Sequence, residues 1–302
     1  MPLAQRRSPV SLRGDLVEGA LRGRADKFTA LFELTRPVNV LIAGLSIALA
    51  GYLCGIGSAW QPLALACAAG ALVTAAANSI NDYFDLEIDR INKPDRPLPS
   101  ARLSRREGLL LAGFCFAAAL LLAFCIHATA LAITFGSGLL LYWYSAHLKR
   151  TVLWGNLVVS LVTALAFIFG GIAVGQFQRA LIPAAFSFLM HFGREIIKDM
   201  EDVDGDAAQQ ARTLPVVHGL FAARWLATLV LLALVPVTLV PWVLRIYGFW
   251  YLLVLLAGVH SVLVLVVWAI WRRPEHATYR WTSTLLKVDM LVGLLAIYAG
   301  RW

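Results

Sequence analysis

Charged residues are scarce in this sequence, and their scarcity excludes an ordinary soluble globular domain. Asp, Glu, Lys and Arg make up 15% of the 302 residues, whereas they make up about a quarter of a typical globular chain. Apolar residues make up 60% of the sequence. Few residues are therefore available to cover a surface in water, and the composition predicts a membrane protein.

Cysteine is also rare. The four cysteines, Cys54, Cys67, Cys115 and Cys125, lie inside or at the ends of apolar segments, and none has CxxC spacing. We therefore expect small core residues, with neither a disulfide framework nor a cysteine metal site. The sequence also lacks a P-loop, a GxSxG motif and a dinucleotide-binding fingerprint. These absences exclude the enzyme classes that are built on those motifs.

Long apolar segments dominate the rest of the chain. A helix needs about 20 residues to cross a hydrocarbon core of about 30 Å. Nine segments come near that length, at 38–56, 62–81, 108–126, 128–146, 153–175, 180–197, 220–241, 246–271 and 284–300. They predict an all-α, polytopic membrane protein with nine transmembrane helices.

Lys and Arg are distributed unevenly between the predicted loops. If the N-terminus is cytoplasmic, the inside loops 82–107, 147–152, 194–224 and 272–287 hold sixteen basic residues, and the outside segments hold only Arg179, Arg245 and Arg301. Positive residues favour cytoplasmic loops. We therefore expect a cell-membrane protein with a cytoplasmic N-terminus. The net charge of +8 is then explained by orientation and contact with anionic lipid, and we expect no nucleic-acid partner.

The first 36 residues differ from the rest, with seven basic and four acidic side chains and no apolar core. A cleavable signal peptide has such a core, so this segment does not resemble one. We expect residues 1–30 to form a basic, partly disordered cytoplasmic arm, and residues 31–302 to form one membrane domain. Nothing in the sequence indicates an obligate protein partner.

Acidic residues are concentrated in two windows, 82–95 and 195–206, which hold eleven of the eighteen in the chain. Each window contains a series that steps by 4, 3 and 4 residues: Asn78, Asp82, Asp85 and Asp89, and Glu195, Asp199, Asp202 and Asp206. On a helix this spacing keeps the side chains on one face. Each window is therefore expected to present a stripe of oxygen ligands at the cytoplasmic ends of the spans. Gly205 is expected to break the second helix and leave Asp206 in a loop.

Carboxylates at this spacing repel one another, so a cation must compensate for them. Oxygen ligands without His or Cys favour a hard ion such as Mg²⁺, which binds one or two carboxylates and leaves positions for substrate phosphates. The cations suited to contact phosphate directly are Lys93, Arg96, Lys149, Arg150, Arg194 and Lys198. Ordinary solvated loops are the alternative, but chance seldom repeats a 4, 3, 4 register. The windows therefore predict a metal-assisted clamp for an isoprenyl diphosphate, whose allylic C–O bond is cleaved.

Several motifs resemble a known family. "NDYFDLEID" (81–89), preceded by Asn78, and "DVDGD" (202–206) are similar to the two aspartate-rich motifs of the UbiA superfamily of intramembrane prenyltransferases. "INKPDRPLPS", "LKRTVLWGN", "FIFGGIAVG" and "GREIIKDMEDVDGD" resemble more narrowly the branch that makes archaeal-type ether lipids. The resemblance covers about residues 31–220, and the last three spans match in hydropathy alone.

The resemblance implies an all-helical bundle and a set of site residues. The ligands of Mg²⁺ would be Asn78, Asp82, Asp85, Asp202 and Asp206, with Asp89 and Asp199 in support. Phosphate groups would be bound by Lys198, and further candidates are Arg36, Arg96, Lys149 and Arg150. The substrates implied are a prenyl diphosphate, with geranylgeranyl as the expected group, and geranylgeranylglyceryl phosphate, whose free hydroxyl attacks the allylic cation.

Two further points stay open at this stage. In "LTRPVN", Arg36 and Asn39 match a family position at the substrate mouth, although Pro37 could simply open the helix while Arg36 reaches the interface. The proton acceptor could be Glu195, Asp199, His191 or the departing diphosphate.

Three other functions compete with this one. An aromatic acceptor from a quinone, haem or chlorophyll pathway would use the same ionisation chemistry. A CDP-alcohol phosphotransferase needs an aspartate where this chain has Glu201, so its motif is not met. A secondary transporter would place its key charges near the middle of the membrane, whereas these acids cluster at one side.

Overall fold

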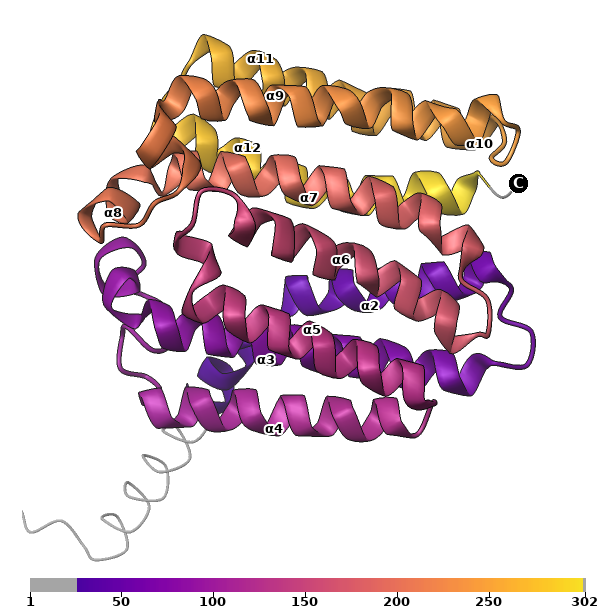
Figure 1. Ribbon diagram of the computed structural model, residues 1–302, viewed down its shortest axis with the longest axis horizontal. Helices are drawn as coiled ribbons and strands as arrows, with labels where there is room; N and C mark the ends of the chain where they lie inside the picture. Colours follow the sequence, from indigo (N-terminus) through magenta and orange to yellow (C-terminus); the bar gives the residue numbers. More distant parts are fainter. Residues whose placement is uncertain (1–25, 301–302) are drawn as a thin grey trace, which may run out of the picture.

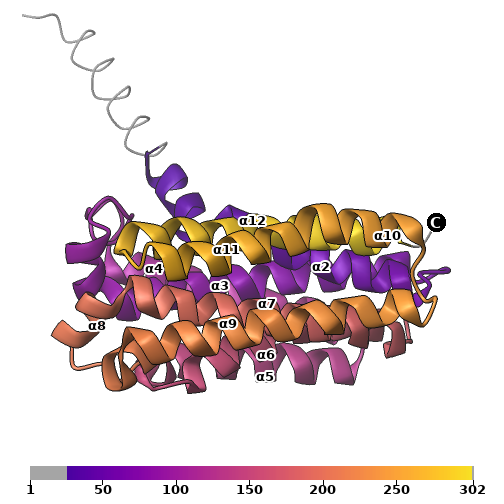
Figure 2. The ribbon, with the colours of Figure 1, turned by 90° about the horizontal axis from the view of Figure 1, so that it is seen from above.

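The computed structural model describes residues 26–300, which form a bundle of long helices that run roughly side by side (Figures 1 and 2). The long helices are α2 (Pro37–Cys54), α3 (Trp60–Asn92), α4 (Arg105–Phe124), α5 (Ala128–Ala146), α6 (Trp154–Ala173), α7 (Leu181–Glu201), α9 (Leu214–Val243) and α12 (His276–Ala299). The shorter elements are η1 (Leu148–Arg150), η2 (Gln178–Ala180), α8 (Val203–Ala208), α10 (Phe249–Val254), the π-helical η3 (Leu255–His260) and α11 (Ser261–Arg272). Between residues 26 and 300 no strand occurs, which confirms the all-α prediction.

The helices match the predicted spans closely. Within the described chain, eight helical segments are long and apolar enough to cross a membrane, and α10, η3 and α11 together make one of them. The predicted span 128–146 is the one outside this group, since the polar and aromatic residues 142–145 lower the hydropathy of α5. A polytopic membrane protein is thus confirmed, and the count of nine spans stays a prediction.

Helix α3 positions the site because it is longer than a membrane span. Its 33 residues give a length of about 50 Å at 1.5 Å per residue, against about 30 Å for the hydrocarbon core. The last turns therefore extend past the apolar part of the helix and carry the first acidic window. The chain then turns back into α4, which begins with a capping box between Ser104 and Glu107.

Close packing of the helices depends on small residues. A Cβ on Gly170 of α6 would lie 2.2 Å from the carbonyl oxygen of Ile47 on α2, so only glycine allows these backbones to approach. The largest buried cluster joins α7, α9, α11 and α12 through residues such as Ile196, Leu231 and Leu286. These contacts fix α7 and α12 against each other beside the second acidic window.

Residues 1–25 lie outside the described residues, so the predicted basic arm stays a prediction. The described chain begins with helical residues 26–34. Ala30 and Leu34 of this segment are fully buried against Leu86, Leu98 and Leu103. The segment therefore packs on the charged end of α3 and on the loop that follows it.

Candidate active site

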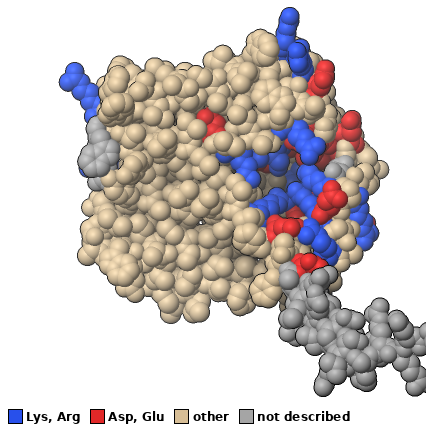
Figure 3. All heavy atoms as spheres, turned by 180° about the vertical axis from the view of Figure 1, so that it is seen from behind, with Lys and Arg blue, Asp and Glu red and all other residues tan. Residues whose placement is uncertain are grey.

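The first acidic window lies on the last turns of α3. Asn78, Asp82, Asp85 and Asp89 share one face of the helix by their spacing. Asp82 is 2% exposed and Asp89 is 4% exposed, although Lys and Arg side chains gather around a hollow at this end of the molecule (Figure 3). Carboxylates this buried require cationic partners.

Cations from three other parts of the chain supply those partners. Arg36, just before α2, pairs with Asp82, and Lys149 from η1 pairs with Asp85. Arg96, in the loop after α3, spans two carboxylates, with Nη1 at 2.6 Å from Asp89 and 3.2 Å from Asp82. The structure thus brings these predicted carboxylates and cations into one network.

Three asparagines also belong to this part of the site. The amide of Asn78 donates to the carbonyl oxygen of Thr35 at 2.7 Å. Asn39 donates to the side-chain oxygen of Asn78 at 3.4 Å, and Asn81 donates to Asp85 at 2.7 Å. The "LTRPVN" segment therefore contacts the first motif directly, through both Arg36 and Asn39. Pro37 also occupies the first turn of α2. The segment therefore both begins the helix, through Pro37, and contacts the first motif, through Arg36.

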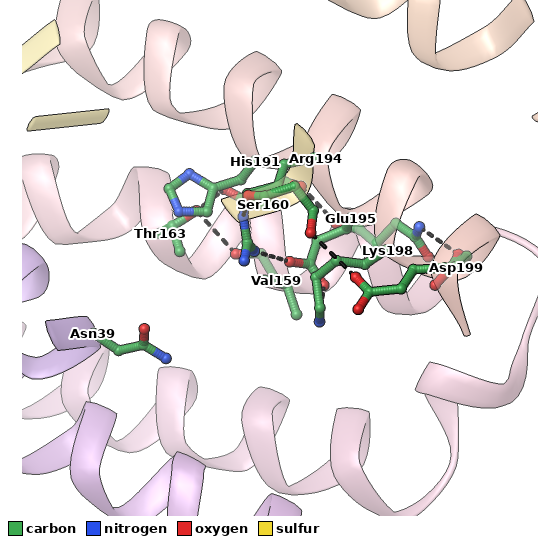
Figure 4. A network of polar contacts seen from close by, with 12 residues as sticks. Asn39, Val159, Ser160, Thr163, His191, Arg194, Glu195, Lys198 and Asp199 are labelled. Carbon is green, nitrogen blue, oxygen red and sulfur yellow. Dashed lines mark hydrogen bonds and ion pairs between the residues drawn. The ribbon is translucent and has the colours of Figure 1, made fainter. Parts of the chain in front are cut away.

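The second acidic window begins on the last turns of α7 (Figure 4). Glu195 is 7% exposed and accepts from Arg194 at 2.8 Å and from Lys198 at 3.3 Å. The amide of Asn156 on α6 donates to Asp199 at 2.8 Å. Across from these side chains, Asn39 points toward them from α2 (Figure 4). Helix α2 thus contacts the first window through Asn39, and α6 contacts the second window through Asn156.

The break in the second helix differs from the prediction. Helix α7 ends at Glu201, the chain bends at Asp202, and Asp206 lies on the short helix α8. The predicted break at Gly205 was wrong, because Gly205 is helical and the bend comes three residues earlier. Asp202 consequently lies just before α8, and Asp206 lies inside it, four residues later. This spacing still places both side chains on one side of the short helix.

The charges of the two windows act on each other. Burial, the largest cause, and the negative charges of Asp202 and Asp85 together raise the pKa of Asp206 to about 6, while a hydrogen bond from Thr213 opposes the shift. Burial lowers the pKa of Lys93, and Asp202 opposes that shift. Asp206 therefore lies within electrostatic range of Asp85 on α3. A divalent cation between them would offset this repulsion.

The donor set fits a hard cation that is shared with a substrate. Among residues 26–300, no three His, Cys, Asp or Glu side chains are gathered closely enough to hold a metal by themselves. Mg²⁺ usually takes one or two carboxylates and completes its shell with water and phosphate oxygens. Asp202 and Asp206 on one side, and the carboxylates of α3 on the other, meet that smaller requirement.

Two predicted residues do not join the network as expected. Arg150 is exposed, and within the described chain its side chain makes no hydrogen bond or ion pair. Its carbonyl oxygen instead accepts from the backbone N–H of Arg212 at 2.8 Å. His191 contacts the carbonyl oxygen of Ser187 at 2.9 Å, and it does not contact Glu195. Both differences arise because backbone geometry, which spacing alone does not reveal, sets where these side chains lie.

Sequence reasoning missed two residues at the site. Asn156, which positions Asp199, lies in the quoted motif "LKRTVLWGN" but has no charge to mark it. Lys287 on α12 lies within electrostatic range of Arg194, Arg36 and Lys198. A lysine inside a predicted span is itself a signal of function, and that signal could have identified Lys287.

An apolar cavity adjoins the second window. It is lined by residues of α2, α6, α7, α9, α10, η3 and α12, among them Ile42, Phe167, Met190, His191, Met290 and Leu294. Ile42 lies six residues beyond Arg36, and His191 lies four residues before Glu195. The cavity therefore begins about one to two helical turns deeper than the charged network.

Comparisons with known proteins identify the family of this chain. Residues 42–290 match the UbiA prenyltransferase family. The digeranylgeranylglyceryl phosphate synthase of Methanothermobacter thermautotrophicus is 37% identical over 268 residues, which cover 89% of this chain and 94% of that protein. Family and relative thus both cover the two acidic windows and most of the bundle.

Solved structures are similar as well. A structure of digeranylgeranylglyceryl phosphate synthase has a TM-score of 0.70 and 32% identity, and the match covers 91% of this chain and 98% of that one. A UbiA homologue from Archaeoglobus fulgidus bound to GPP and Mg²⁺ has a TM-score of 0.61 at 19% identity, covering 89% of this chain and 99% of that one, and shows the same fold. The acidic windows, the fold and the matched length agree, and this chain belongs to the UbiA prenyltransferase family.

Proposed function

We propose that this chain transfers a geranylgeranyl group from its diphosphate to the free hydroxyl of geranylgeranylglyceryl phosphate, with Mg²⁺, at the cytoplasmic side of the cell membrane. The observation that carries the proposal is the pair of acidic windows, which lie within electrostatic range of each other and have partly buried cations paired to the first of them, beside an apolar cavity. A diphosphate head and a hydrocarbon tail fit this combination of polar and apolar surfaces. The names of the relatives support the choice of acceptor.

The carboxylates of both windows would hold the metal. On α3 the proposed ligands are Asn78, Asp82, Asp85 and Asp89, and at α8 they are Asp202 and Asp206. Mg²⁺ bound there would neutralise the charge that develops on the departing diphosphate. Asp199, held by Asn156, supports the second group from the last turn of α7.

The cations of the network would hold the phosphate groups. Arg36, Arg96 and Lys149 now pair with α3 carboxylates, so each already lies beside the proposed diphosphate position. Lys93 makes no ion pair within residues 26–300 and lies near Asp202. The remaining proposed contacts are Asn39, Arg194, Glu195 and Lys198 on the opposite side, and Arg150 at the exposed edge.

The reaction breaks the bond between the allylic C1 and the diphosphate oxygen, and the electron pair leaves with the diphosphate. The acceptor hydroxyl oxygen then forms an ether bond to C1, and its proton is lost to a base. Glu195 is held by Arg194 and Lys198 and Asp199 by Asn156, so both are positioned carboxylates. The lining of the cavity is almost entirely apolar, and such a lining disfavours water, which would otherwise capture the allylic cation.

Transfer of radiolabelled geranylgeranyl from its diphosphate tests the proposal. The purified chain with Mg²⁺ should form a labelled ether lipid from geranylgeranylglyceryl phosphate. Asp202→Asn should lower the rate by about a hundredfold or more, as for loss of an electrostatic group at the reacting centre. Asp204→Asn is the matched control, because Asp204 lies on the same short helix but is exposed.

The outcomes separate the competing functions. Product from an aromatic acceptor alone would place the chain in a quinone, haem or chlorophyll pathway. Movement of substrate across sealed vesicles without any product would favour a transporter. Full activity in Asp202→Asn and in Asp82→Ala would contradict the proposed site even if the chain makes the ether product.

A further inference from the structure

Helix α12 brings one cation to the site that neither acidic window accounts for. Lys287 is partly buried within the apolar segment of this helix, and in the described chain it makes no hydrogen bond or ion pair. The charges within electrostatic range of it, from Arg194, Arg36 and Lys198, are all positive. An ionisable side chain is costly in a membrane helix, so one that is kept without a partner indicates a ligand.

Arg194 holds α7 to this turn of α12. Its Nε donates to the carbonyl oxygen of Ser283 at 2.9 Å, and its Nη1 donates to Glu195 at 2.8 Å. Ser283 lies four residues before Lys287, so the two lie one turn apart on the same side of α12. The guanidinium of Arg194 is therefore fixed next to the turn that carries Lys287.

Positive charge is in excess at this position. We use the name α7–α12 cation cluster for Arg194, Lys198 and Lys287. Arg36 has Asp82 as its partner, whereas Arg194 and Lys198 share the single carboxylate of Glu195. Lys287 has none within residues 26–300. A ligand with two negative charges, such as a phosphate monoester, would balance the excess.

The apolar cavity begins about one helical turn from this cluster along α7 and α12. Met190 and His191 line it from α7, three to four residues before Arg194. Met290 and Leu294 line it from α12, three and seven residues after Lys287. A ligand with its phosphate at the cluster would thus extend an apolar chain into the cavity. This combination describes a phosphorylated lipid.

We infer that Lys287, together with Arg194, binds the phosphate of the acceptor lipid, apart from the metal-held diphosphate of the donor. The inference rests on the proposed function, because it assigns a residue to the acceptor of that reaction. The diphosphate position lies between α3 and α8, where carboxylates can hold Mg²⁺ and where Lys93 and Lys149 lie. A phosphate beside Lys287 needs no metal, because the surrounding side chains are themselves cationic.

Steady-state kinetics of the full chain test this assignment with two acceptors, geranylgeranylglyceryl phosphate and its dephosphorylated alcohol. Lys287→Gln should raise KM for the phosphorylated acceptor by about tenfold, the loss expected for one charge-assisted hydrogen bond. KM for geranylgeranyl diphosphate should change by less than about twofold, since the contact is made to the other substrate. The preference for the phosphorylated acceptor over the alcohol should fall by the same factor.

Two variants serve as controls. Lys287→Arg keeps the charge and should recover most of the affinity for the phosphorylated acceptor, which separates charge from packing. Arg280→Gln removes an exposed cation from the same helix and should leave both KM values unchanged.

The kinetic results decide whether Lys287 binds the phosphate of the acceptor. An equal rise in KM for geranylgeranyl diphosphate, or unchanged preference between the two acceptors in Lys287→Gln, would overturn the assignment. Loss of activity in both Lys287→Gln and Lys287→Arg would also overturn it, because charge would then not be the property that matters. If the unaltered chain makes no ether product from either acceptor, the proposed function itself fails, and this result is distinct from the others.

Discussion

Arg96 bridges two carboxylates of the first acidic window. It joins the loop after α3 to Asp89 at 2.6 Å and to Asp82 at 3.2 Å. Both carboxylates are buried, at 4% and 2% exposure. Arg96→Met would leave Asp89 without a cationic partner, while Asp82 would keep Arg36.

The expected cost follows from this geometry. Removing one partner of a buried ion pair costs about 3–5 kcal/mol, because the other charge is left uncompensated. The Arg96 side chain is 27% exposed, so solvent screens part of the interaction and lowers that cost. We therefore expect Arg96→Met to reduce the free energy of unfolding by about 2 kcal/mol.

A double-mutant cycle distinguishes this mechanism from loss of packing. Asp89→Asn removes the charge that Arg96→Met leaves unpaired, so the double variant should regain about 1 kcal/mol or more relative to the sum of the single changes. Equilibrium unfolding in detergent micelles, followed by circular dichroism, measures each variant. Arg102→Met is the matched control, because its ion pair with Glu33 is exposed and should contribute about 1 kcal/mol or less.

Additive effects in this cycle would refute the reasoning. If the double variant lost the sum of both single effects, the charges of Arg96 and Asp89 would not be coupled. A loss in Arg102→Met as large as that in Arg96→Met would show that burial does not set the cost.

Three further predictions concern packing, polar support and metal. Gly170→Ala should lower the free energy of unfolding by about 1–3 kcal/mol through overpacking, because the new Cβ would lie 2.2 Å from the carbonyl oxygen of Ile47. The control is Gly113→Ala, whose Cβ would have no atom within 4 Å. This control should be neutral or stabilising in the same unfolding assay. Asn156→Ala should lower the free energy of unfolding by about 1–3 kcal/mol, because it leaves Asp199 without its amide donor. A decrease in the unfolding temperature no larger than that of Gly113→Ala would contradict this prediction. Chelation with EDTA should abolish prenyl transfer and added Mg²⁺ should restore it, whereas activity that persists after exhaustive chelation would refute metal dependence.

The acidic windows show how much of the site the sequence predicted. Asn78, Asp82, Asp85 and Asp89 were predicted to share a helix face because their spacing matches the helical period, and α3 does continue through all of them. The bend at Asp202 was not predicted, because Gly205 was the only local signal for a break. Helix α7 ends at Glu201, with the backbone N–H of Asp202 bonded to the carbonyl oxygen of Lys198, and no short motif encodes this end.

Composition and periodicity determined the membrane class, the helical fold and the positions of most spans, since these depend on local hydropathy and on the helical repeat. The family followed from motifs that are continuous in the sequence. Contacts between distant segments were decided only by tertiary structure: Arg194 reaches Ser283, Asn156 reaches Asp199, and Lys287 faces the charges of α7. The physical reason is that a lone Asn or Lys carries no spacing signal, so its role depends on the helix that packs against it.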